Sequence, residues 1–135
     1  MHTLTLRLSP GDDLRLALDL AVRSQKSAQE AGAAFVLQGI GSLSVAALRY
    51  AGRDEATVLR GDLEILTLAG SLSADGPHLH MSISDADGRV FGGHVTAGCI
   101  VRTTAEVLIA KLPDERYTRE HDPATGFAEL VIRRT

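Results

Sequence analysis

The most informative stretch of this 135-residue chain is residues 78–94, which read HLHMSISDADGRVFGGH. Polar and apolar residues alternate before the central DADGR, and this period of two is typical of a β-strand. A three-residue loop of residues 86–88, with Gly88 in the left-handed conformation, would join that strand to the next one as a hairpin. The loop sets Asp85 opposite Arg89 and thereby predicts the register of the whole hairpin.

Three histidines converge in this register. His78 and His80 lie on one face of their strand, and His94 lies opposite His80 on the same face. Three neutral imidazoles form the protein half of an open zinc site, whose fourth position is left for water or a ligand. The alternative is that they are polar sheet residues or hydrogen-bond partners. A two-residue loop would also turn His94 to the other face.

Outward from the hairpin, strand patterns separated by short turns fill most of the chain. Residues 2–8 alternate as a half-buried strand, and residues 9–13 have the character of a helix start. Apolar residues then follow at helical spacing from Leu14 to Ala28, and Gly32 is a natural stop. Residues 105–112 have a composition that also suits a helix, but their β-branched residues favour a strand. Further strands are expected at residues 33–38, 45–50, 63–69, 78–84, 89–95, 99–112 and 127–133.

These elements predict an α+β fold in a single domain spanning residues 1–135. One long main helix is expected to pack across a strongly curved sheet, largely antiparallel or mixed. Residues 39–44, GIGSLS, lack the third glycine of a dinucleotide fingerprint and the lysine of a P-loop. We interpret them as a tight bend where backbones pack closely rather than as a phosphate loop.

The net charge limits the kinds of binding partner that we expect, and the number of cysteines indicates the redox conditions around the protein. The net charge is −3, and proteins that grip nucleic-acid phosphates usually carry a basic field, so direct nucleic-acid binding is disfavoured. The one cysteine, Cys99, excludes an intrachain disulfide and fits a reducing cytosol. A buried structural role suits Cys99 better than a nucleophilic one. We see no signal peptide and no membrane span, and we therefore expect a cytoplasmic protein.

Two charged residues are candidates for chemistry beside a metal. Glu64 is an acid within an apolar strand, and an ionised acid is rarely buried without a partner. It either faces solvent or meets a partner such as Arg49 or a histidine, as a carboxylate that orients a metal ligand would. In a catalytic interpretation, Glu64 shuttles a proton and Arg49 pairs with a substrate carboxylate.

Five blocks of the sequence, in order and at matching spacing, resemble the PPC family (the plants and prokaryotes conserved domain). The resemblance covers roughly residues 5–133, and five blocks in register are far more specific than any one of them. The blocks are residues 39–49 (GIGSLSVAALR), 61–70 (GDLEILTLAG), 76–85 (GPHLHMSISD), 92–99 (GGHVTAGC) and 103–107 (TTAEV).

The resemblance implies a compact homotrimer, with His78, His80 and His94 corresponding to clustered histidines that can hold zinc. It also implies a fold similar to that of acetolactate decarboxylase, although that similarity alone establishes no activity. Plant members bind DNA through a preceding AT-hook, and this chain has none. The plant contact segment GRFEIL reads GDLEIL at residues 61–66, so the plant partners do not carry over.

Three hypotheses follow. The first is a homotrimeric binding module whose histidines hold a metal, with zinc the candidate, or a small ligand, and whose surface recruits protein partners. The second is a zinc-dependent enzyme that acts on a small oxygenated acid, with the metal polarising a carbonyl or activating water. The third, direct DNA binding, is disfavoured by the charge and by the missing hook. Metal analysis, a screen of small molecules and a salt titration of DNA binding distinguish them.

Overall fold

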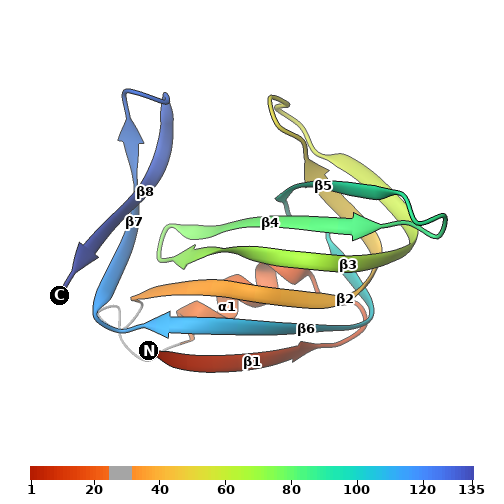
Figure 1. Ribbon diagram of the computed structural model, residues 1–135, viewed down its shortest axis with the longest axis horizontal. Coiled ribbons are helices and arrows are strands. Elements are labelled where there is room, and N and C mark those ends of the chain that lie inside the picture. The colour runs from red at the N-terminus through yellow and green to blue at the C-terminus, as the bar shows by residue number, and fades with distance from the viewer. Residues whose placement is uncertain (25–31) are drawn as a thin grey trace.

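The computed structural model describes residues 1–24 and 32–135. Most of this part of the chain is β-structure, shown in Figure 1. The elements in chain order are β1 (His2–Leu8), α1 (Leu14–Arg23), β2 (Ala33–Arg49), β3 (Thr57–Ser73), β4 (Gly76–Ser84), β5 (Val90–Val95), β6 (Ile100–Leu112), β7 (Glu115–Asp122) and β8 (Phe127–Arg134).

Six strands form one antiparallel sheet in the order β1-β6-β2-β3-β4-β5. The end of β2 also pairs with β5, with Leu48 opposite Val95 and Arg49 opposite His94. In the strand order β5 is an edge strand and β2 is a central one. Their extra pairing therefore makes the sheet curve strongly, so that its β5 edge meets β2. Strands β7 and β8 form a separate two-stranded sheet that projects from the body at the end distant from the β4–β5 loop (Figure 1).

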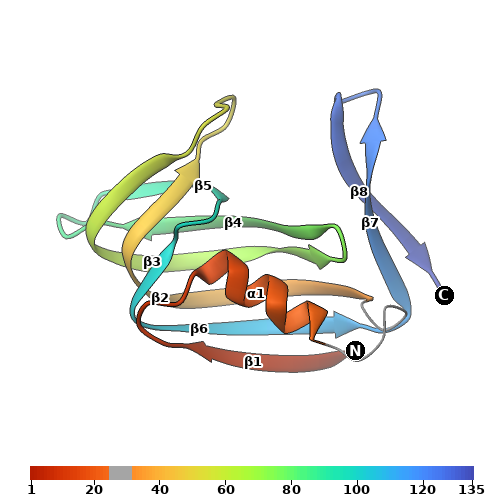
Figure 2. The same cartoon turned by 180° about the vertical axis from the view of Figure 1, so that it is seen from behind.

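Helix α1 lies against one face of the six-stranded sheet, as Figure 2 shows. Leu14, Leu18 and Val22 recur at helical spacing and are buried against it. The side chain of Asp13 caps the helix, since its Oδ1 atom accepts a hydrogen bond of 3.0 Å from the amide of Leu16. The hydrophobic core therefore lies between α1 and the curved sheet.

The predicted α+β class is wrong, because the protein is a β-rich antiparallel fold with one short helix in the described residues. Helix α1 has 10 residues and ends at Arg23. The rest of the predicted helix falls largely on residues 25–31, which lie outside the described part of the chain. The sheet is antiparallel, which is one of the two alternatives that the sequence predicted. The strand content was underestimated: the predicted strands 33–38 and 45–50 join into β2, and the predicted strand 63–69 lengthens into β3, each with 17 residues.

The predicted bend at residues 39–44 lies within β2 rather than between two separate strands. Register shifts interrupt the pairing of β2 with β6 between Gly41 and Leu43 and again between Leu43 and Val45, so the strand bends without ending. The close backbone packing predicted there is present: a Cβ atom on Gly39 would lie 2.9 Å from Cδ2 of Leu68, and one on Gly41 would meet the backbone of Thr104.

The chain after residue 99 contains two strands that were predicted, β6 and β8, and one that the sequence analysis missed, β7. Residues 105–112 form a strand within β6, as predicted. Strand β7 was not predicted because its sequence, ERYTREHD, is almost wholly polar, and Tyr117 is the buried residue in it. Pairing with β8 along its whole length holds it in the strand conformation. Among the described residues, no helix has the length and hydrophobicity needed to cross a membrane.

Candidate metal centre

The β4–β5 hairpin has the predicted loop and register. The amide of Asp85 donates a hydrogen bond of 2.9 Å to the carbonyl oxygen of Arg89, and Gly88 has a φ of 76°. The carboxylate of Asp85 also accepts hydrogen bonds of 2.9 Å from the amides of Asp87 and Arg89, which stabilise the loop. In consequence His80 lies directly opposite His94.

The three imidazole rings form a compact cluster. One ligand nitrogen from each of His78, His80 and His94 lies within 4.8 Å of the others. Nε2 of His80 is 3.1 Å from Nδ1 of His94, and the ring centroids of His78 lie 5.0 Å and 5.4 Å from those of His80 and His94. Two nitrogens on one tetrahedral zinc ion are about 3.4 Å apart, given Zn–N bonds of about 2.1 Å. The cluster therefore fits a zinc-sized ion with small ring movements.

The surroundings of His78 and His94 favour the neutral form of their imidazoles. Burial lowers the pKa of His78, and the positive charge of Arg119 lowers it further. Burial also lowers the pKa of His94, followed by the charge of Arg49. A metal binds the lone pair of a neutral imidazole, so a lowered pKa extends the pH range in which these nitrogens are available.

Two glycines let β5 bring His94 to this position. A Cβ atom on Gly93 would lie 2.8 Å from the carbonyl oxygen of Arg49, and one on Gly92 would lie 3.1 Å from that of Met81. A side chain at position 93 would therefore force β5 away from β2, and one at position 92 would crowd β4. The pair Gly92-Gly93 directly before His94 is the sequence signal that could have revealed this contact.

The structure brings Arg49 to the histidines but not Glu64. Arg49 pairs with His94 across β2 and β5, and both line the same two pockets. Glu64 is exposed on β3 opposite Ser84, and it lines a different pocket. It is five residues along β3 from Ala69, the partner of His80, which is about 16 Å at the usual rise per residue.

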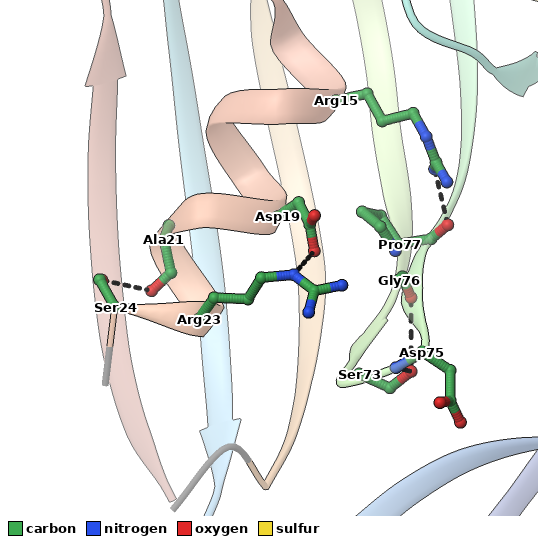
Figure 3. A network of polar contacts seen from close by, with 9 residues as sticks. All are labelled: Arg15, Asp19, Ala21, Arg23, Ser24, Ser73, Asp75, Gly76 and Pro77. Atoms are coloured by element: carbon green, nitrogen blue, oxygen red, sulfur yellow. Dashed lines mark hydrogen bonds and ion pairs between the residues drawn. The ribbon is translucent and has the colours of Figure 1, made fainter. Parts of the chain in front are cut away.

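Two further arginines that the sequence analysis did not select lie beside the histidines. Arg119, from β7, lines a pocket of about 550 Å³ together with His78, His94 and Glu129. Arg15 extends from α1, and its Nη1 atom donates a hydrogen bond of 2.7 Å to the carbonyl oxygen of Pro77, the residue before His78 (Figure 3). Neither could be found from sequence, because each reaches the site only through the packing of its element.

Cys99 is buried, as predicted, and lies away from the cluster in the core. Its Sγ atom is 3.3 Å from the amide nitrogen and 3.4 Å from the carbonyl oxygen of Ala47. Burial raises the pKa of this thiol, which suits a packed side chain rather than a nucleophile.

Comparison with known proteins identifies a family and relatives. Residues 1–113 match the model of the Plants and Prokaryotes Conserved (PCC) domain. Strands β7 and β8 follow the matched residues. Two curated proteins, each named bifunctional protein GlmU and each from a Synechococcus strain, are 48% identical over 129 and 128 residues. The matches cover 96% and 95% of this chain but 20% of each GlmU, so the chain spans about a fifth of the length of these relatives.

Solved structures share the fold along nearly the whole chain. A hypothetical protein from Salmonella cholerae-suis superposes with a TM-score of 0.92 at 38% identity, covering 98% of this chain and 94% of the other. A metal-containing protein from Archaeoglobus fulgidus superposes with a TM-score of 0.78 at 27% identity, covering 97% of this chain and 94% of the other. A candidate DNA-binding protein from Bacteroides thetaiotaomicron gives 0.82 at 19% identity, covering 96% and 91%, and shows the fold alone.

Proposed function

This chain belongs to the Plants and Prokaryotes Conserved domain family, and from that premise we propose that it is a homotrimeric binding module that holds a metal ion on His78, His80 and His94. The observation that carries the proposal is the convergence of three ligand nitrogens within 4.8 Å of one another. Zinc is the candidate ion because it favours imidazole ligands and tetrahedral geometry. The similarity to a metal-containing protein from Archaeoglobus fulgidus supports the same interpretation.

The residues of the chain position the ligand nitrogens and set the charge around such a site. The hairpin register holds the three rings in place, and burial together with the arginine charges lowers the pKa of His78 and His94, which favours their neutral form. A bound zinc ion would supply a Lewis-acidic centre with one position open to water or to a ligand. Arg49 and Arg119, which line the adjoining pocket, would orient a ligand there.

The trimer is supported by an exposed apolar surface. Because side chains alternate along a strand, residues next to buried core positions face away from α1. Four of these outward residues on β2, β3 and β6 are large and apolar, with exposed fractions of 38–51%: Leu37, Ile40, Leu66 and Leu108. Apolar side chains gathered on three adjacent strands are typical of a surface covered by another subunit. Sedimentation equilibrium should give three times the mass of the chain.

Elemental analysis of the purified protein tests the metal site. We expect about one zinc per chain in the parent protein and in a His121→Ala control, since His121 is exposed on β7 outside the cluster. His80→Ala should lose the metal because two imidazoles and water bind zinc far more weakly than three. Equal metal content in the His80→Ala and parent proteins would overturn the proposal.

A second candidate function is a zinc-dependent enzyme that acts on a small oxygenated acid. The position of Arg49 opposite His94 favours it, because a guanidinium beside the ion could pair with a substrate carboxylate. Glu64, the residue suggested as proton shuttle, lines a different pocket, so this function needs another proton carrier. A screen of small acids with zinc-loaded protein tests it, and turnover in the parent but not in Arg49→Gln is the supporting result.

Direct DNA binding is the least supported function. The chain carries a net charge of −3, and the structural relative described as a candidate DNA-binding protein is 19% identical. Phosphate contacts would make binding fall steeply with salt. We expect no measurable binding to duplex DNA at low ionic strength. In the GlmU relatives the matching region is about a fifth of a longer chain, which supports a module that works beside other domains.

A further inference from the structure

A second pocket adjoins the histidines on the side of α1. It has a volume of about 240 Å³, and its polar lining comes mainly from Arg15, Arg49, His78 and His94. Asp75 and Glu129 line the larger pocket nearby, whereas none of the described residues that line this smaller one is acidic. The smaller pocket is therefore cationic. We call it the arginine pocket.

The two arginines are held by backbone carbonyls rather than by acids. Arg15 donates to the carbonyl oxygen of Pro77 at 2.7 Å, and Arg49 donates to that of Arg53 at 3.2 Å. Within residues 1–24 and 32–135, neither guanidinium forms an ion pair with a carboxylate. Each guanidinium has five N–H donors, so both keep donors for a further acceptor.

Four arginines elsewhere on the protein are held differently. Arg23, Arg89, Arg102 and Arg133 each pair with a nearby carboxylate. Arg15 and Arg49 are only partly exposed and lie beside imidazoles that carry no negative charge. Two partly desolvated cations that share a pocket repel each other unless an anion lies between them.

We infer that the arginine pocket binds the carboxylate of a small organic acid, whose second oxygen-bearing group reaches the metal position on the histidines. The carboxylate fits because a planar guanidinium fork donates two parallel hydrogen bonds to it. The ligand is small because the pocket is below the range of about 300–1,000 Å³ that holds drug-sized molecules. The contact between the second oxygen-bearing group and the metal rests on the proposed metal site. The contact between the carboxylate and the two arginines does not.

A carboxylate suits the pocket better than a phosphate group. Phosphate sites in proteins commonly use several backbone amides at a helix N-terminus. Here the donors are side chains, and the hydroxyl of Thr96, which also lines the pocket, already donates to the carbonyl oxygen of Ala47 at 2.8 Å. The two guanidinium groups are thus the main hydrogen-bond donors in this pocket.

Calorimetric titration with glycolate tests the inference on metal-free protein, prepared with a chelator, in low-salt buffer. We expect glycolate to bind and glycolamide, its neutral analogue, to bind at least tenfold more weakly. Arg49→Gln and Arg15→Gln should each raise the Kd for glycolate by tenfold or more, because each removes charge-assisted hydrogen bonds. Arg7→Gln is the matched control, since Arg7 is exposed on β1 at the opposite edge of the sheet.

Three results would overturn the inference: equal binding of glycolate and glycolamide, equal affinity in the Arg49→Gln and Arg7→Gln proteins, or tighter binding of inorganic phosphate than of glycolate. The variants Arg15→Lys and Arg49→Lys keep the positive charge. They show whether a loss of binding in the glutamine variants comes from the lost charge or from misfolding. They should retain part of the affinity. Repeating the titration with zinc-loaded protein should lower the Kd. Glycolate binding without zinc binding would refute the metal site alone, and zinc binding without glycolate binding would refute the carboxylate site alone.

Discussion

Nε2 of His80 lies 3.1 Å from Nδ1 of His94, although the two residues are 14 positions apart in the chain. The contact exists because the three-residue loop at 86–88 sets the two histidines directly opposite each other on β4 and β5. A change of one residue in the loop would turn one ring to the other face of the sheet. The candidate metal centre therefore depends on the length of a loop that contains none of its ligands.

Deletion of Ala86 should abolish metal binding while leaving most of the fold intact. The shorter loop shifts the pairing by one residue and separates His94 from the other two rings. Zinc affinity, measured by competition with a chromogenic chelator, should fall by at least 100-fold. Ala86→Ser keeps the loop length and should bind zinc like the parent. Parent-like affinity in the deletion protein would contradict the role of the register.

Gly93→Ala should destabilise the protein and weaken the metal site together. A Cβ atom there would lie 2.8 Å from the carbonyl oxygen and 3.2 Å from the carbonyl carbon of Arg49, so β5 must move away from β2. Overpacking of this kind typically costs about 1–3 kcal/mol in the free energy of unfolding. Urea denaturation measures that cost. An Ala variant as stable as the parent would show that β5 can shift freely.

Acid should reduce the stability of the metal-free protein as the pH falls below about 6.5, the ordinary pKa of histidine. Burial and the nearby arginines lower the pKa values of His78 and His94 in the folded state. The unfolded chain therefore takes up protons first, and unfolding is favoured until the folded protein is protonated too. Urea midpoints at pH 7.5 and pH 5.5 measure the loss. A double His78→Gln, His94→Gln variant should show a smaller loss, and an equal loss would contradict this explanation.

The thiol of Cys99 should react slowly with a disulfide reagent in the native protein. Its side chain is fully buried, and burial raises its pKa, so little thiolate is accessible at pH 8. We expect the reaction to be on the order of 100-fold faster in 6 M guanidinium chloride. The absorbance of the released thiolate measures both rates. A native rate close to the denatured one would mean that the core opens readily around β6.

The sequence predicted the hairpin and its cluster of three histidines because alternation and loop chemistry are local properties. The register of His80 and His94 follows from residues 85–89 alone. The class of the fold could not be predicted in the same way. Whether β2 ends or bends at Gly41 depends on how closely β6 approaches, and that contact involves residues about 60 positions away. Arg15 and Arg119 were missed for the same reason, since α1 and β7 bring them to the site through tertiary packing.

Asp13→Ala should lower both the stability of the protein and the affinity of the arginine pocket. One carboxylate oxygen of Asp13 caps α1 through the amide of Leu16 at 3.0 Å, and the other accepts a hydrogen bond of 2.7 Å from the amide of Gly98. The residue thus fastens the start of α1 to the turn between β5 and β6. Losing the cap alone should cost about 1 kcal/mol. The lost bond to Gly98 should add about 1–3 kcal/mol.

Arg15 lies two residues after Asp13 on the first turn of α1, so a loosened helix start should also move its guanidinium away from the carbonyl of Pro77. Asp19→Ala is the matched control, because Asp19 pairs with Arg23 on the helix surface, a contact worth about 0.3–0.5 kcal/mol. Urea denaturation and glycolate titration should therefore both separate the two variants. If Asp13→Ala lost stability but bound glycolate like the parent, α1 would hold Arg15 in place independently of its cap.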